Sequence, residues 1–219
     1  YARQDRKTRG REPISSKLVA DLMSTAGVTR VVTMDLHAGQ IQGFFNVPVD
    51  HLMSASLLAD YVKSKNLENL TIVSPDLGGV TRARELADRV GAPIAIIEKR
   101  RPEPGVAKVM NIIGDVRGKH VILLDDMVDT GGSLCHAAQA LMEIGGAQDV
   151  TACASHGVLS GPAIDRINSS VLDEVIFLDT IPAKPGVKCE KIKYISVAHM
   201  FAEAISHIYM ETSVSPLFL

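Results

Sequence analysis

The sequence predicts an α/β protein with mostly parallel sheets. Short β-branched or apolar runs alternate with helical patterns along most of the chain, and such alternation implies crossover connections between parallel strands. The composition agrees, because the chain is 46% hydrophobic but only 4% aromatic, so its core is built from aliphatic side chains. The length of 219 residues corresponds to one large domain or two small ones, at roughly 150 residues per domain.

The first predicted helix follows a strongly polar segment at residues 1–12. Ser15 or Ser16 is the expected N-cap, apolar residues follow at helical spacing, and Gly27 is the expected stop. A β-branched strand is then predicted at residues 30–34, directly before Asp35-Leu36-His37.

The same order repeats along the rest of the chain. Helices are expected at residues 55–65, 78–90, 134–144 and 198–210, and strands at 70–74, 92–97, 109–113, 120–124 and 150–154. A charged loop rich in proline and glycine is expected at 98–105. Residues 26–37 and 145–156 share the order helix end, glycine, strand and histidine, which indicates either two related halves or a chance likeness of two βα units.

Charge, hydropathy and cysteine content exclude several classes of protein. Lys plus Arg is 23 and Asp plus Glu is 25, for a net charge of −2, whereas a dedicated nucleic-acid binder is usually strongly basic. We find no apolar run near the ~18 residues of a membrane helix. The first residues do not have the basic-then-apolar pattern of a secretory leader, so we do not expect secretion. The three cysteines show no metal or redox spacing, so we expect reduced thiols in a cytoplasmic protein with no membrane partner.

The strongest functional signal lies at residues 121–133. An apolar strand is followed by Asp125 and Asp126, and a short turn then presents Asp129, Thr130, Gly131, Gly132 and Ser133 where a helix begins. Ligands of α/β sheets bind at the carboxyl ends of strands, and amides at a helix N-terminus can hold a phosphate. Paired carboxylates can accept sugar hydroxyls or hold hydrated Mg²⁺. The alternative is a capped helix after a tight turn, without a ligand.

This segment resembles the phosphoribosyl pyrophosphate (PRPP) loop of the phosphoribosyltransferase fold. The chain as a whole is similar to the ribose-phosphate pyrophosphokinase family, on the motifs at residues 1–7, 35–45, 73–76, 99–102, 159–163 and 213–215. The resemblance implies two tandem phosphoribosyltransferase-like domains. The first would comprise 1–50 plus 198–219 and be incomplete, since the family's leading segment is absent, and the second would comprise 51–197.

The resemblance also implies an activity. The family transfers the diphosphoryl group of Mg-ATP to the C1 hydroxyl of ribose 5-phosphate and releases AMP. Ribose 5-phosphate would be bound by Asp125, Asp126, Asp129, Thr130, Gly131, Gly132 and Ser133. The metal positions match His37 and Asp76, the catalytic loop matches Lys99 and Arg101, and an ATP-binding pair matches Arg3 and Gln4.

Regulation and assembly are implied on fewer residues. An allosteric phosphate and ADP site between subunits matches Gln42, Asp50, Ser213, Val214 and Ser215, with Lys7 near it. The family forms homo-oligomers, commonly hexamers. Ser133 stands where the family has Thr, and the ending from Pro216 departs from its pattern. Without the leading segment, we expect impaired folding and no ATP-dependent activity from this chain alone.

Two other functions stay open on these residues. A phosphoribosyltransferase would consume PRPP, but the run Lys99-Arg100-Arg101-Pro102 and Asp35-Leu36-His37 argue against it. A catalytically silent regulatory homologue, or an inactive fragment, is the other alternative. A silent homologue is expected to lose its charged site residues, whereas the acidic and basic positions named above are all retained.

Overall fold

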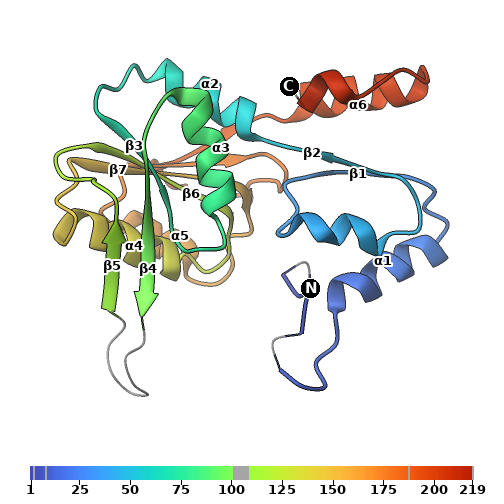
Figure 1. Ribbon diagram of the computed structural model, residues 1–219, viewed down its shortest axis with the longest axis horizontal. Helices are drawn as coiled ribbons and strands as arrows, with labels where there is room; N and C mark the ends of the chain where they lie inside the picture. Colours follow the sequence, from blue (N-terminus) through green and yellow to red (C-terminus); the bar gives the residue numbers. More distant parts are fainter. Residues whose placement is uncertain (2, 8, 101–108, 187, 219) are drawn as a thin grey trace. The chain divides into compact units, whose positions relative to one another are not determined.

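The computed structural model describes residues 1, 3–7, 9–100, 109–186 and 188–218 (Figure 1). The chain divides into two compact units, Tyr1–Ser54 with Val197–Leu219, and Ala55–Ser196. Both units combine helices with parallel strands. The α/β fold with mostly parallel sheets is thereby confirmed. No helix in the described ranges has both the length and the apolarity to cross a membrane.

The second unit is built on a seven-stranded sheet of order β5-β4-β3-β6-β7-β8-β9. Its strands are β3 (Leu70–Ser74), β4 (Ile94–Arg100), β5 (Val109–Ile113), β6 (His120–Val128), β7 (Asp149–Gly157), β8 (Glu174–Leu178) and β9 (Ile192–Ile195). Neighbouring strands are parallel except for the antiparallel pair β4–β5 at one edge. Strand β6 therefore lies in the middle of the sheet.

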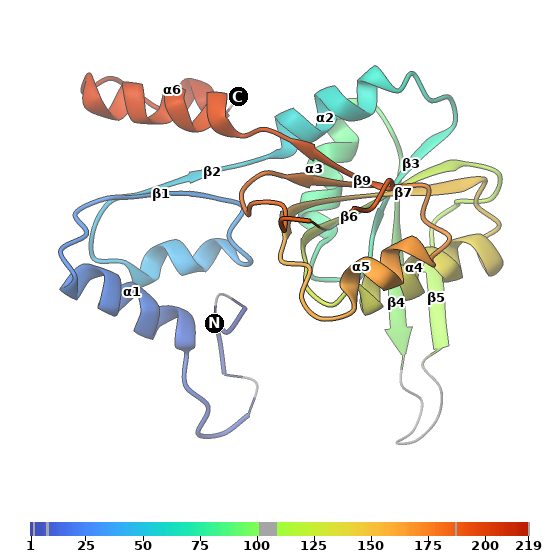
Figure 2. The same cartoon turned by 180° about the vertical axis from the view of Figure 1, so that it is seen from behind.

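Helices cover both faces of this sheet. Figures 1 and 2 show α2 (Ala55–Ser64) and α3 (Val80–Val90) over one face, and α4 (Gly132–Glu143) and α5 (Ala163–Asn168) over the other. Side chains of β6 alternate between these layers. Val121 and Leu123 belong to the main apolar cluster with Leu134 and Leu141 of α4, while residues 122 and 124 are buried against the opposite layer.

The first unit has a smaller sheet, in which β1 (Val31–Met34) pairs in parallel with β2 (Val49–Leu52). The other elements are α1 (Ser15–Thr25), α6 (Ala198–Tyr209) and the 3-10 helices η1 (Gly39–Phe44) and η2 (Ser215–Phe218). Figure 1 shows α1 and α6 on opposite sides of the two strands. Large apolar side chains stay exposed on both helices: Leu18, Leu22, Ile205 and Tyr209.

The helices and strands expected from the sequence are confirmed in type, but some local details are wrong. Ile14, not Ser15 or Ser16, is the N-cap of α1, and the Ser16 hydroxyl instead donates to the carbonyl of Gln4 at 2.8 Å. Strand β6 runs on to Val128, so both adjacent aspartates lie within it. Strand β4 includes residues 98–100, which were expected in a loop; residues 101–105 of that loop lie outside the described part of the chain.

Candidate active site

The candidate site lies where the strand order of the second unit changes direction. The chain passes from β3 outward to β4 and then returns to β6 on the other side of β3. Strands β3 and β6 are parallel to each other, so their carboxyl ends lie at the same edge of the sheet. Asp76 follows β3, and Asp125 and Asp126 lie near the end of β6. Such a switch point is where α/β sheets bind ligands.

The loop after β6 presents backbone amides to this edge. Gly131 has a φ of +74°, in the left-handed region, and α4 begins at the next residue. The first intrahelical bond runs from the Cys135 N–H to the Gly131 carbonyl at 3.0 Å. The amides of Gly132, Ser133 and Leu134 therefore have no partner within the helix. Together with the positive end of the helix dipole, they make an anion-binding position.

The segment before and within α5 supports this loop. The Ser160 N–H donates to the Asp129 carbonyl at 2.9 Å, and the Ser160 hydroxyl donates to the Asp129 carboxylate. Arg166 Nη1 donates to the carbonyl of Thr130 at 2.9 Å. A Cβ at Gly132 would lie 3.3 Å from the same Nη1, so glycine leaves room for this guanidinium. Neither Ser160 nor Arg166 was predicted from the sequence to have a role at the site.

The adjacent carboxylates are held in different environments. Asp126 is 4% exposed, and its Oδ1 lies 3.9 Å from Nη1 of Arg82 on α3. The Asp126 N–H donates to Oδ1 of Asp125 at 2.9 Å. Burial raises the pKa of Asp125 well above its usual range, and the neighbouring Asp126 carboxylate and the charge of Asp76 raise it further. A bound cation would relieve this crowding of negative charge.

Asp76 is fixed by the turn that opens α3. Its Oδ1 accepts the N–H groups of Gly78 at 2.9 Å and Gly79 at 3.1 Å. A Cβ at Gly79 would lie 2.7 Å from the Ser74 hydroxyl, so this turn requires glycine. The carboxylate thus stays exposed in one orientation at the end of β3.

A divalent cation would meet carboxylate donors here. The described residues contain no cluster of three or more His, Cys, Asp or Glu side chains that could hold a metal ion. Mg²⁺ does not need such a cluster, because it keeps several waters and usually binds one or two carboxylates together with substrate phosphates. Asp125 and Asp76, whose charges act on each other, fit that donor set.

Of the two expected catalytic cations, the structure describes the backbone of one. Lys99 lies in β4, next to β3, and its backbone pairs with Met110 of β5. Arg101 lies outside the described residues.

The remaining expected site residues belong to the first unit. His37 is exposed beyond β1 and follows Asp35, whose φ is +42°. The metal pair predicted from His37 and Asp76 is therefore divided between the two units. Arg3 is exposed, and the carbonyl of Gln4 accepts the N–H of Ser16 at 3.3 Å, which ties the polar N-terminal segment to α1.

The residues expected in an allosteric site make local contacts. Gln42 donates to the Gly39 carbonyl at 3.0 Å. Asp50 is held by Arg30 through two hydrogen bonds, of 2.7 and 3.2 Å. Ser213 Oγ accepts the N–H of Ser215 at 3.2 Å, with Val214 between them, and Lys7 is exposed. Most of these polar groups are therefore already engaged within the first unit.

Comparison with known proteins shows which protein family this chain resembles. Residues 99–219 match the phosphoribosyl synthetase-associated domain, and residues 1–27 match the N-terminal domain of ribose phosphate pyrophosphokinase. The ribose-phosphate pyrophosphokinases of Clostridium acetobutylicum and Bacillus caldolyticus are 57% and 59% identical, over 100% of this chain and 69% of each relative.

A solved structure agrees with the sequence comparisons. The phosphoribosylpyrophosphate synthetase of Mycobacterium smegmatis superimposes with a TM-score of 0.90 at 44% identity, over 96% of this chain and 69% of that one. Fold, switch-point site and relatives together define a transferase of the kinase class that moves phosphate groups. Within that class, the chain belongs to the ribose-phosphate pyrophosphokinase family.

Proposed function

We propose that the chain transfers the diphosphoryl group of Mg-ATP to the C1 hydroxyl of ribose 5-phosphate, which gives PRPP and AMP. The observation that carries this proposal is the anion-binding loop at residues 129–133, which follows the buried Asp126 and the partly buried Asp125 at the switch point of the sheet. A sugar phosphate matches both parts of the site, because its phosphate suits the loop and its hydroxyls suit the carboxylates. The similarity to ribose-phosphate pyrophosphokinases and to a phosphoribosylpyrophosphate synthetase supports the same substrates.

In this proposal the loop binds the 5-phosphate of the sugar. The amides of Gly131, Gly132 and Ser133 donate to its oxygens, and the hydroxyls of Thr130 and Ser133 add further donors. Asp129, held by Ser160, and Asp125 accept the ribose hydroxyls, with Asp126 beside them. The sugar is thereby oriented with its C1 hydroxyl turned away from the loop.

The transferring group needs neutralisation of negative charge more than covalent chemistry. We propose that Lys99 and Arg101 bind the phosphates of ATP, and that Arg3 and Gln4 bind the rest of the nucleotide. Asp76 and His37 would hold Mg²⁺, which when bound neutralises phosphate charge and aligns the phosphoryl oxygens.

Assembly, regulation and location belong to the same proposal. A homo-oligomer, a hexamer as in the family resemblance, would bring Gln42, Asp50 and residues 213–215 to an allosteric phosphate and ADP site at a subunit boundary. Symmetric self-assembly is the common state of enzymes of this size. A cytoplasmic location is supported by the free thiols of all three cysteines, which persist in reducing compartments.

The test is calorimetric titration of the chain with ribose 5-phosphate, and with ribose as the ligand that lacks the phosphate. We expect Asp129→Asn to weaken ribose 5-phosphate binding by about tenfold or more, as for a lost charge-assisted hydrogen bond. Asp88→Asn is the matched control, because Asp88 is exposed on α3 away from the loop. Equal binding of ribose and ribose 5-phosphate, or an unchanged affinity of Asp129→Asn, would refute the proposal.

A further inference from the structure

A separate cavity of about 320 Å³ lies in the second unit and has no role in the proposed reaction. Its lining comes from the β7–α5 connection, α5, the segment between β8 and β9, and β9, and comprises Leu159, Ile164, Ala183, Lys184, Lys188, Cys189, Glu190, Ile192 and Tyr194. The carboxylates and the phosphate-binding loop do not line it. This volume is within the range of small-molecule sites.

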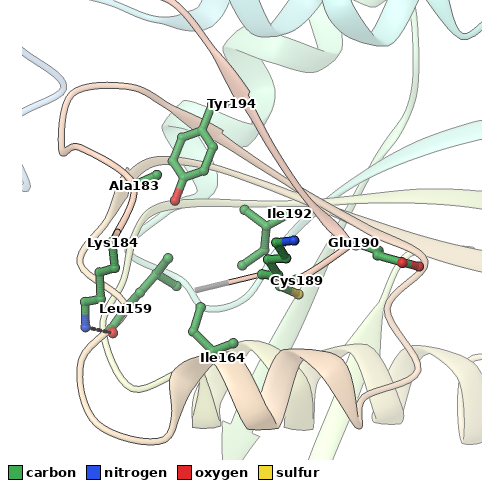
Figure 3. Close-up of a pocket in the computed structure, with 9 residues that line it drawn as sticks. Leu159, Ile164, Ala183, Lys184, Cys189, Glu190, Ile192 and Tyr194 are labelled. Atoms are coloured by element: carbon green, nitrogen blue, oxygen red, sulfur yellow. Dashed lines mark hydrogen bonds between the residues drawn. The ribbon is translucent and has the colours of Figure 1, made fainter. Parts of the chain in front are cut away.

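The cavity combines apolar walls with an excess of positive charge. Figure 3 shows Leu159, Ile164, Ile192 and the ring of Tyr194 around one space. Two lysines line the cavity against one glutamate. The Lys188 ammonium makes no hydrogen bond or ion pair to another described residue. An apolar ligand body with one anionic group is complementary to these walls.

One wall of the cavity is also a support of the phosphate-binding loop. Leu159 is 3% exposed and has a φ of +50°, a conformation that L-residues with large side chains rarely adopt. Its N–H donates to the Val128 carbonyl at 3.0 Å, and its own carbonyl accepts the ammonium of Lys184, as the dashed line in Figure 3 shows. The next residue, Ser160, bonds to Asp129. Contacts in the cavity therefore act on the backbone that holds the loop.

We propose that this cavity is a regulatory site for a small molecule that joins an apolar ring to a carboxylate or phosphate. The anionic group of the ligand lies against Lys188 and Lys184. Because an ammonium has three N–H donors, Lys184 can bind this anion and still donate to the Leu159 carbonyl. The ring lies between Ile164, Ile192 and Tyr194. Occupancy stabilises residues 159–160 and, through them, the loop.

The test uses 1-naphthoate as the probe and the Cys189 thiol as the local reporter. Cys189 is partly exposed at the cavity, so saturating 1-naphthoate should slow its alkylation by iodoacetamide at least fivefold. Cys135, partly exposed outside the cavity, serves as the internal control and should change less than twofold. Unprotected Cys189, or equal protection of both thiols, would overturn the proposal.

Two comparisons test the charge requirement. The neutral 1-naphthamide should protect Cys189 at least fivefold less well at equal concentration. Lys188→Met should weaken protection by 1-naphthoate at least fivefold, while Lys63→Met, at an exposed lysine in the last turn of α2, should leave it unchanged. Equal protection by the amide, or equal loss in both variants, would show that the lysines do not bind the anion.

Hydrogen exchange tests the link to the loop without any sugar phosphate, so its outcome is separate from that of the proposed function. The amides of Leu159 and Ser160 should exchange at least threefold more slowly in saturating 1-naphthoate. Amides of α2, which does not line the cavity, should be unaffected. Unchanged exchange at Leu159 and Ser160 despite protection of Cys189 would refute the regulatory part of the proposal.

Discussion

The two units of the chain differ in what stabilises them. The second unit has a seven-stranded sheet with helices on both faces, and side chains as large as Phe177 and Leu141 are completely buried in it. The first unit has two paired strands and a short set of buried apolar residues, while Leu22 and Ile205 remain exposed. Its specific contacts include polar ones, such as the Arg30–Asp50 pair.

This difference explains where a preformed ligand site can exist. The loop at residues 129–133 is carried by the central strand of the larger sheet and is held from a second element by Ser160 and Arg166. Binding geometry is more exact on such a rigid support. The turn that carries His37 rests on a smaller frame, so we expect its stability to depend on a few hydrogen bonds.

The largest effect is expected from the core of the second unit. Phe177→Ala removes a fully buried ring that lies 3.0 Å from the position of a Cβ at Gly157. We expect a loss of about 3–5 kcal/mol in the free energy of unfolding. Urea denaturation measures it, with Leu22→Ala as the exposed control at less than about 0.5 kcal/mol. Similar losses in both variants would mean that the two units do not differ as described.

A smaller effect is expected from a hydrogen bond in the first unit. Asp35 is 2% exposed with a φ of +42°, and its Oδ1 accepts the Ser54 N–H at 3.2 Å. Asp35→Ala removes this acceptor and disfavours the left-handed backbone, for a loss of about 2 kcal/mol. Hydrogen exchange of the β1 and β2 amides measures the loss. Asp35→Asn, which keeps an acceptor and tolerates this backbone, should retain most of the protection.

The smallest effect has the opposite sign, because a substitution at the candidate site should raise the free energy of unfolding. Because burial and Asp126 raise the pKa of Asp125, its ionisation destabilises the fold at every pH above the pKa of an unfolded aspartate, about 3.9. Asp125→Asn removes that charge and should add about 1 kcal/mol to the free energy of unfolding at pH 8.

The same Asp125→Asn substitution should add almost nothing near pH 3.5, where much of the carboxyl is protonated in both states. Urea unfolding at the two pH values measures this, and ribose 5-phosphate binding should weaken at the same time. A variant that is destabilised at pH 8 would contradict the assigned environment of Asp125.

The sequence predicted the elements whose signals are local. The bounds of α2 and β3 differ from the expectation by at most one residue, because periodicity and turn residues define them. The length of β6 was wrong, because pairing with β7 extends it: Asp125 pairs with Ala154 and Val128 with Gly157. Strand β4 likewise extends through its antiparallel pairing with β5. Such pairing joins residues far apart in the sequence.

In the candidate site, too, local sequence signals could be predicted, whereas contacts between distant residues could not. Residues 129–133 were predicted from the sequence as a phosphate-binding loop because glycines and hydroxyls follow an apolar strand. Ser160 and Arg166 were not assigned, because their contacts to the loop exist only once α5 packs beside it. The short helix α5 has six residues, too few for a clear periodic signal.

The strained backbone at Leu159 has a consequence for how this sequence can change over evolutionary time. The bond from Lys184 helps to hold a conformation that leucine would otherwise avoid. Natural selection would then act on the two positions together. Among homologues, loss of a cation at position 184 should coincide with glycine or asparagine at position 159, residues that need no such restraint.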